Sequence, residues 1–124
     1  MINCFYINVE KMNEEPIFLK SGEQKSVKET PGKRFRLMIK SKNIEAIIAE
    51  IQPHTSSRWY KHTGEELHYV LEGEIEYEVG GKSFKLKKGE LLWHNSNVKH
   101  RAVNHTDKMA KYATVGTPPT FIIE

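Results

Sequence analysis

The chain lacks the features that would place it outside a reducing compartment or inside a membrane. It contains one cysteine, Cys4, so no intrachain disulfide can form. No apolar run approaches the length that crosses a bilayer. The first residues also lack the basic start and long apolar stretch of a signal peptide. We therefore expect a cytoplasmic protein without a membrane segment.

A concentrated basic surface is also missing. The formal net charge is only +3, and the Lys and Arg residues are spread along all 124 positions. The densest basic stretch, residues 82–88, is interrupted by Phe84 and Leu86, as is typical of the solvent face of a hairpin. Binding to phosphates requires clustered cations, so we do not expect a nucleic-acid partner.

The sequence has no long helical periodicity and contains short strand-like runs instead. Residues 74–79 alternate strictly between acidic and apolar side chains, and Gly80-Gly81 follows as a two-residue turn. Residues 82–87 continue the alternation, which predicts that Phe84 and Leu86 face inward. Turn signals recur at short, even intervals, and this pattern indicates an all-β antiparallel barrel or sandwich.

The chain length suits one domain. We expect residues 34–124 to form the barrel and residues 1–33 to supply N-terminal strands and a loop that pack on it. Within the N-terminal part, Ser21–Lys33 is expected to be a loop because it contains Gly22, Pro31 and Gly32.

Histidines and one glutamate form the most informative group. His62 and Glu66 flank a short turn, and a strand that begins at Glu66 would place alternate residues on one face. His100 lies further along the chain, after the turn at Gly89, so in an antiparallel barrel it can face the same cavity. The residues that share this face are Tyr60, His62, Glu66, His68 and Val70.

Two imidazoles and one carboxylate on rigid strands make a ready ligand set. Such a set suits zinc, iron, manganese, nickel and copper ions and leaves coordination positions open for water or substrate. We therefore expect His62, Glu66 and His100 to bind a divalent transition metal ion. The alternative is a metal-free polar pocket in which the same residues hydrogen-bond a ligand or one another.

These residues resemble the first motif of the cupin superfamily, which has the form G(x)5HxH(x)3-4E(x)6G. The chain has Tyr60 where the first histidine stands, followed by His62, Glu66 and, after six further residues, Gly73. The resemblance implies a double-stranded β-helix, or jelly-roll barrel, that holds a metal ion with three histidines and one glutamate.

The second cupin motif, G(x)5PxG(x)2H(x)3N, is matched by Gly89, His100 and Asn104 at the same spacing. Asn95 and Asn97 stand in place of its proline and second glycine. Residues 62–90 and the TPPTF segment near the end look especially like the cupin domain that follows a helix-turn-helix in bacterial transcriptional regulators. The chain has no room for that DNA-binding domain, so we expect a small stand-alone relative.

Tyr60 and His68 distinguish this sequence from the pattern. Tyr60 could donate a hydrogen bond to a bound water or substrate, form an ordinary part of the wall, or ligate a metal directly. A phenol has a pKa of about 10, so it ligates a metal weakly unless it is deprotonated. His68 should face the cavity as a further ligand, a general base, a substrate contact or a packed histidine. In an enzyme, Tyr60 and His68 would be the catalytic acid or base.

The remaining candidate residues are expected to lie away from the metal. Of the neighbours Trp93 and His94, one must face inward; we expect Trp93 to be buried and His94 to point outward or to an interface. His54 and His105 lie in expected loops. Arg58 could meet an anionic ligand at the mouth of the barrel or form a surface salt bridge.

Three classes of function remain open from the sequence. The protein could be an enzyme that acts on a small polar molecule through an open metal site, a small-molecule or metal-sensing binding module, or a non-catalytic structural protein. The resemblance to small cupins implies a homodimer that adds or exchanges N-terminal strands, because residues 1–20 contain apolar pieces that the barrel motifs do not require.

Overall fold

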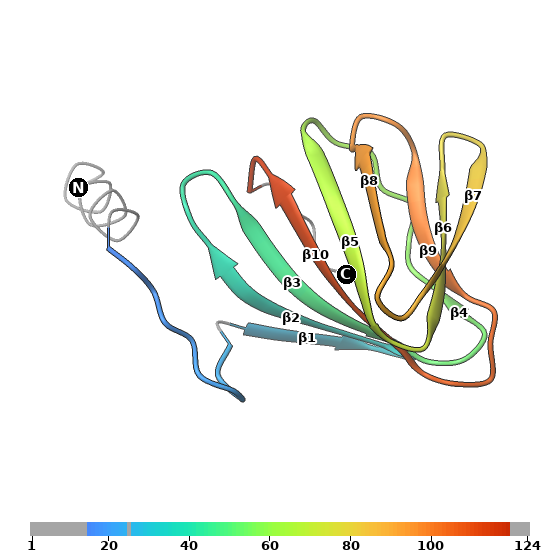
Figure 1. Cartoon of the computed structure of the whole chain (residues 1–124), viewed down its shortest axis with the longest axis horizontal. Helices are drawn as coiled ribbons and strands as arrows, with labels where there is room; N and C mark the ends of the chain where they lie inside the picture. The colour runs from blue at the N-terminus through green and yellow to red at the C-terminus, as the bar shows by residue number, and fades with distance from the viewer. Residues whose placement is uncertain (1–14, 25, 120–124) are drawn as a thin grey trace.

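The structure, a computed structural model, describes residues 15–24 and 26–119, which build two facing β-sheets (Figure 1). Within this part of the chain, no helix is long and apolar enough to cross a membrane. The strands are β1 (Ser26–Thr30), β2 (Lys33–Lys40), β3 (Glu45–Ile51), β4 (Thr55–Ser56), β5 (Glu65–Glu72), β6 (Glu74–Val79), β7 (Lys82–Lys87), β8 (Leu91–Asn95), β9 (His100–Asn104) and β10 (Ala110–Thr117).

The sheets have the antiparallel jelly-roll arrangement that the sequence predicts. One sheet has six strands in the order β1-β2-β3-β10-β5-β8, and the other has four in the order β4-β9-β6-β7. Figure 1 shows the larger sheet sweeping across the molecule, with the smaller sheet facing its β5–β8 end. The all-β jelly-roll fold is therefore confirmed.

The β6–β7 hairpin follows directly from its sequence. Val79 pairs with Lys82 across the two-residue turn. Gly80 and Gly81 both have positive φ, 56° and 85°, which is the backbone that a type I′ turn requires and that glycine adopts without strain. The alternating pattern of β6 then buries Ile75 in the core.

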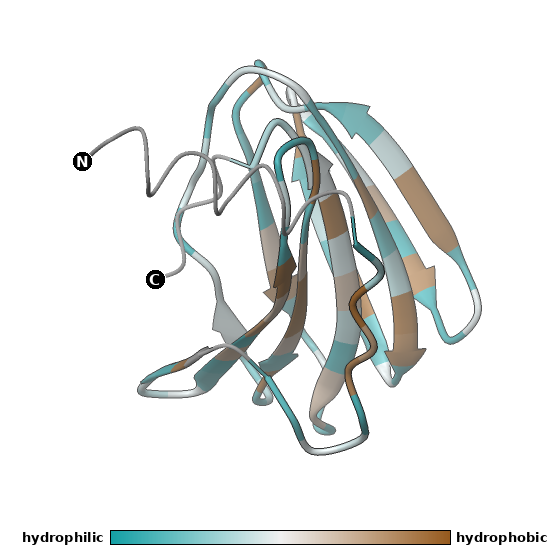
Figure 2. Cartoon of the chain, turned by 90° about the vertical axis from the view of Figure 1, so that its left-hand side faces the viewer, coloured by the Kyte–Doolittle hydropathy of each residue, from teal (hydrophilic) through white to brown (hydrophobic). Residues whose placement is uncertain are grey.

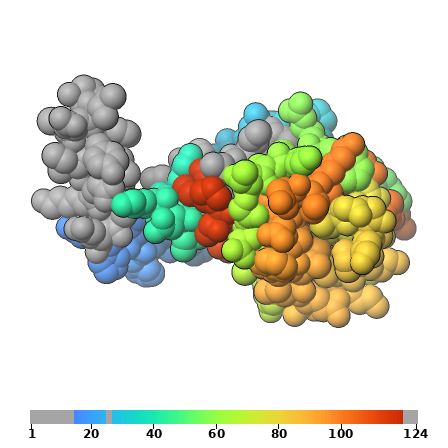
Figure 3. All heavy atoms as spheres, turned by 90° about the horizontal axis from the view of Figure 1, so that it is seen from above, coloured from blue at the N-terminus to red at the C-terminus, as the bar shows by residue number. Residues whose placement is uncertain are grey.

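The core lies between the two sheets. It is built by one face of each strand, so polar and apolar bands alternate along the strands in Figure 2. Figure 3 shows the strands from β5 to β9 gathered in a rounded body, with the β2–β3 turn projecting away from it. The core residues with the least exposure are Ala49, Ile51, Val70, Ile75, Ala102, Ala110 and Tyr112.

One local prediction was wrong, and another needs a qualification about exposure. The segment Ser21–Lys33 is not entirely a loop, because Ser26–Thr30 pairs with β2 through a turn at Gly32. Phe84 shares the inward face of its buried partner Tyr77, as predicted, but it is still 37% exposed. It lies on β7, an edge strand of the smaller sheet, so little structure covers it. Cys4 and the apolar piece around it lie outside the described residues.

Candidate metal centre

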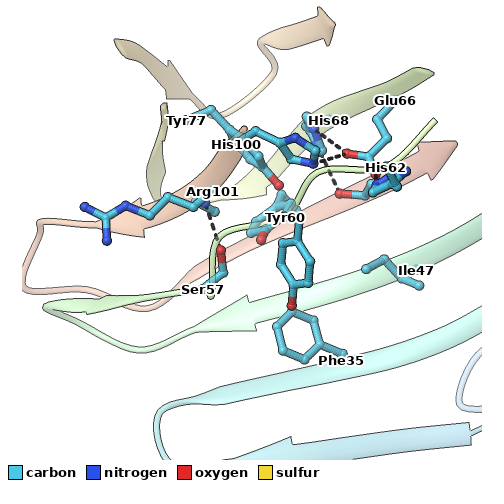
Figure 4. Close-up of a pocket in the computed structure, with 13 residues that line it drawn as sticks. Phe35, Ile47, Ser57, Tyr60, His62, Glu66, His68, Tyr77, His100 and Arg101 are labelled. Atoms are coloured by element: carbon cyan, nitrogen blue, oxygen red, sulfur yellow. Dashed lines mark hydrogen bonds and ion pairs between the residues drawn. The ribbon is translucent and has the colours of Figure 1, made fainter. Parts of the chain in front are cut away.

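The predicted site residues meet in one cavity of about 50 Å³ between the sheets (Figure 4). Glu66 and His68 project from β5, His62 precedes this strand, and His100 begins β9. Tyr60 also lines the cavity, so the shared face expected from the sequence is present. Figure 4 shows His62, His68 and His100 converging on the carboxylate of Glu66.

Backbone hydrogen bonds hold the segment that carries His62. The His62 N–H donates to the carbonyl of Ser96 at 2.9 Å, and the Ser96 N–H donates to the carbonyl of Gly64 at 2.8 Å. Gly64 has φ of 103° and lies against the backbone of Thr117, where a side chain would not fit. The turn between His62 and Glu66 is therefore anchored to the two neighbouring segments.

Tyr60 and His100 are held opposite each other. The Tyr60 N–H donates to the carbonyl of His100 at 2.8 Å, and the His100 N–H returns a bond of 2.9 Å to the carbonyl of Tyr60. Their ring centres are 6.3 Å apart. Tyr60 therefore stands in the wall beside His100, at the position where the cupin motif has a histidine.

The imidazole orientations suit metal binding. His62 Nδ1 lies 3.0 Å from the carbonyl oxygen of Thr63, and His100 Nδ1 lies 2.7 Å from that of Val98. A carbonyl oxygen only accepts hydrogen bonds, so each Nδ1 carries a hydrogen, and Nε2 is left as the nitrogen that can coordinate a metal ion. Both Nε2 atoms face Glu66, at 2.8 Å from Oε2 for His62 and 3.5 Å from Oε1 for His100.

The carboxylate of Glu66 is buried but remains ionised. Burial raises its pKa, but the hydrogen bond from His68 and the charges of His68, His100 and His62 outweigh this effect and leave the pKa lowered. Glu66 is the only carboxylate among the described residues that line the cavity. It therefore supplies the negative charge that a bound cation would require.

His68 is nearly fully buried, at 1% exposure. Burial lowers the pKa of His68 to about 4, against the hydrogen bond and charge of Glu66, which raise it. Its Nε2 lies 2.9 Å from His94 Nε2 and 3.4 Å from Glu66 Oε1. His68 faces the cavity as expected, and it is neutral at physiological pH.

His94 was predicted to point outward, and this was wrong. His94 is 6% exposed, whereas Trp93 is 52% exposed. The register explains the difference, because His94 pairs directly with Glu66 and Trp93 with Leu67, so His94 shares the inward face of Glu66. Trp93 Nε1 instead donates to Glu65 Oε1 on the outer face, at 2.7 Å.

The inward direction of His94 follows from the pairing of β5 with β8. The local sequence gives no indication of this pairing. Two other strands lie between β5 and β8 in the chain. Hydrophobicity alone favours burial of Trp93, and it therefore predicts the wrong member of the pair.

The other candidate residues lie outside the cavity. Arg58 is exposed and does not line it. His54 and His105 are exposed, as expected, with Nε2 atoms 2.8 Å from Asp107 and 3.5 Å from Glu76 respectively. These two histidines serve as internal controls for any measurement at the buried ones.

The buried histidine predicts that the metal-free protein loses stability in mild acid. The unfolded chain protonates His68 near pH 6.5, while the folded state resists protonation until about pH 4. The unfolded state therefore binds more protons within this window, and stability falls as the pH falls. The lowered pKa values of His100 and Glu66 act in the same direction.

Lowering the pH from 7 to 5 should reduce the free energy of unfolding by about 2 kcal/mol through the protonation of His68 alone. Urea unfolding of chelator-treated protein at the two pH values measures this, and His68→Phe should reduce the difference. Equal stability at both pH values would contradict the assignment.

The chain is similar in sequence to part of a bacterial regulator. It is 30% identical over 82 residues to the HTH-type transcriptional regulator PuuR of Escherichia coli (strain K12). The match covers 65% of this chain and 44% of the regulator. The chain thus spans less than half the length of this curated relative.

The fold is similar to those of several solved structures. KdgF from Halomonas sp. matches with a TM-score of 0.75 at 17% identity, covering 84% of this chain and 94% of that one. An RmlC-like cupin from Shewanella frigidimarina matches with a TM-score of 0.73 at 19% identity, covering 85% and 94%. Residues 47–116 match the cupin domain family Cupin_2. These residues make up more than half of the chain, and the protein therefore belongs to the cupin family.

Proposed function

We propose that this cupin binds a divalent transition metal ion at an open site formed by His62, Glu66 and His100, and that it binds or acts on a small polar molecule there. The observation that carries this proposal is the orientation of the two imidazoles. Each donates Nδ1–H to a backbone carbonyl and directs its Nε2 toward the single carboxylate. A metal ion placed between these atoms would be coordinated by both Nε2 atoms and the carboxylate.

The donor set fits zinc, iron, manganese or nickel. Imidazole and carboxylate ligands in one group, with all ligand atoms within 4.8 Å of one another, are present at His62, Glu66 and His100. Cupin domains commonly bind divalent metals. A metal ion held there would supply Lewis-acid activation of a bound oxygen atom.

Two further residues would act on the bound molecule. Tyr60 lines the cavity, and its hydroxyl would donate a hydrogen bond to the bound molecule. His68 reaches the same cavity as a neutral imidazole and can accept a proton in an enzymatic reaction. We assign both residues as the acid and base candidates of this proposed activity.

The cavity volume supports a small ligand. A space of about 50 Å³ holds a few waters, since each needs about 10–15 Å³ measured in this way. Pockets for drug-sized ligands measure about 300–1,000 Å³. The site is therefore suited to a molecule of a few heavy atoms that can coordinate the metal.

A non-catalytic sensing module is the second candidate function. The similarity to a transcriptional regulator favours it, because a sensor needs a pocket but no proton transfer. A sensor should carry its ligand through purification, which native mass spectrometry would detect. An enzyme should instead release its product and leave coordination positions to exchangeable water.

Zinc titration of chelator-treated protein tests the open site. We expect the Nε2 nitrogen resonances of His62 and His100 to shift on metal binding, because those atoms face Glu66. His100→Ala should weaken the response at His62 by about 10- to 100-fold, whereas the exposed control His105→Ala should not. Binding below a tenth of an equivalent for every ion tried, or binding without a shift at His62 and His100, would refute the proposal.

We also propose a cytoplasmic homodimer in which residues 1–33 pack on the barrel. In the described structure the outer face of the six-stranded sheet provides an apolar surface. Tyr69, Leu91 and Trp93 are 41–53% exposed there. Val115 pairs with Leu67, and Leu67 pairs with Trp93, which extends the apolar row across three strands. Such a face favours association with a second copy.

Trp93→Lys should convert the dimer to a monomer at micromolar concentration, because it places a charge on the most exposed residue of this apolar row. Light scattering would measure the mass. Phe84→Lys is the matched control, since Phe84 is also exposed but lies on the opposite sheet. A monomeric wild-type protein would refute the homodimer, and a dimer that survives Trp93→Lys would exclude this face.

A further inference from the structure

A second group of potential ligands lies beside the predicted one and is more deeply buried. Glu66, His68 and His94 have ligand atoms that all lie within 4.8 Å of one another. Their exposures are 6%, 1% and 6%. His68 stacks on the core residue Tyr77, with ring centres 3.9 Å apart, so this group reaches into the interior of the barrel.

The three ligand atoms form a compact triangle. His68 Nε2 and His94 Nε2 are 2.9 Å apart, and they lie 3.4 Å and 3.6 Å from Glu66 Oε1. A tetrahedral zinc site with bonds of about 2.0–2.1 Å has ligand atoms about 3.3 Å apart. The three distances scatter around this value, so an ion fits the triangle with small side-chain adjustments.

The hydrogen bonds outside the triangle also suit metal ligation. His94 Nδ1 lies 2.7 Å from the carbonyl oxygen of Asn95, so it carries the hydrogen and leaves Nε2 bare. His68 Nδ1 lies 2.7 Å from the hydroxyl of Thr114. A hydroxyl both donates and accepts, so Thr114 can hold His68 in either tautomer.

Metal binding at this position requires only a tautomer change in His68. Because a neutral His94 carries its hydrogen on Nδ1, the contact between the two Nε2 atoms in the metal-free state requires His68 to donate its Nε2–H to His94 Nε2. When an ion takes the Nε2 lone pairs, the His68 hydrogen moves to Nδ1 and is donated to Thr114. No net proton is released from His68, and burial already keeps this side chain neutral.

We propose that Glu66, His68 and His94 form a second, enclosed metal position, distinct from the open site and suited to a tetrahedral ion such as Zn²⁺. The two positions share Glu66: its Oε2 faces His62, and its Oε1 faces His68 and His94 as well as the open-site ligand His100. One carboxylate offsets only part of the charge of a single divalent ion. The wild-type protein is therefore expected to hold about one ion, distributed between the two positions.

A variant that lacks the open-site imidazoles isolates the enclosed position. Chelator-treated His62→Ala/His100→Ala protein is titrated with Zn²⁺, and histidine nitrogen resonances are recorded together with a circular dichroism check of folding. We expect about one equivalent of Zn²⁺ with shifts of the His68 and His94 Nε2 resonances. His54 and His105 should not shift.

Addition of His94→Phe to this variant should lower the Zn²⁺ affinity about 100-fold. The proposal would be overturned if His62→Ala/His100→Ala bound Zn²⁺ no more tightly than the variant that also carries His94→Phe. Binding without shifts at His68 and His94 would also overturn it. If the double alanine variant does not fold, His62→Gln/His100→Gln preserves the polar character of both positions, and the same outcomes apply.

The reverse variant separates this inference from the proposed function. His68→Phe/His94→Phe removes the enclosed position and leaves His62, Glu66 and His100 in place. Zinc binding in this variant together with its absence in His62→Ala/His100→Ala would support the open site and overturn the enclosed one. The opposite pair of results would support the enclosed position and refute the open site.

Discussion

Replacement of Glu66 by glutamine is expected to lower the affinity for divalent transition metals by about 100-fold or more at both positions. Mutation of residues that only support metal ligands already costs about 10- to 100-fold, and Glu66 is a proposed ligand itself. It is also the only carboxylate among the described cavity residues. A neutral amide would leave the imidazoles to bind the cation without charge compensation.

Glu65→Gln is the matched control for this prediction. The same chemical change then occurs one residue away on β5, where the Glu65 carboxylate accepts the Trp93 N–H on the outer face. Calorimetric titration with Zn²⁺ should show near-normal binding for Glu65→Gln and strongly weakened binding for Glu66→Gln. Equal affinities in the two variants would mean that the metal binds elsewhere.

Gly64→Ala is expected to destabilise the protein by about 4 kcal/mol or more, a size reached only when a substitution creates a clash or strain. The added Cβ would overlap the carbonyl oxygen of Thr117 and lie 2.6 Å from Pro118 Cδ, at a φ of 103°. These are backbone and ring atoms that no side-chain rotation can move. Urea unfolding of the metal-free protein measures the loss.

The same substitution should weaken the open metal site, because Gly64 lies in the turn that positions His62. Its carbonyl accepts the N–H of Ser96, whose own carbonyl accepts the N–H of His62. Gly81→Ala is the control, since Gly81 has φ of 85° but no atom near the added Cβ. Gly81→Ala should lower the free energy of unfolding by the backbone strain alone, about 1–2 kcal/mol, and leave the metal affinity unchanged. Similar losses in both variants would show that the packing around Gly64 is unimportant.

Much of the site could be predicted because its residues depend on local periodicity. Alternation along a strand places Glu66 and His68 on one face whatever the rest of the fold does. The β6–β7 hairpin is equally local, because two glycines in sequence permit the tight turn. The cupin motif spacing then connects this local information to His100, which no periodicity within β5 could reach.

Other features depend on contacts between distant segments. His94 is inward because β8 pairs with β5 in a register that sets His94 opposite Glu66. β1 exists because β2 offers a partner, although Ser21–Lys33 contains turn-forming residues. Phe84 follows the correct alternation but lies on an edge strand, where the fold provides too little cover to bury it.

The sequence by itself thus determined the all-β fold and the family, and it predicted that His62, Glu66 and His100 lie together, because these follow from alternation, turn chemistry and motif spacing. Only the tertiary structure decided which imidazole nitrogens face Glu66 and that His94 joins the buried cluster. These outcomes depend on strand register and on hydrogen bonds to particular backbone carbonyls. Both arise when the two sheets come together, and neither is visible along a single strand.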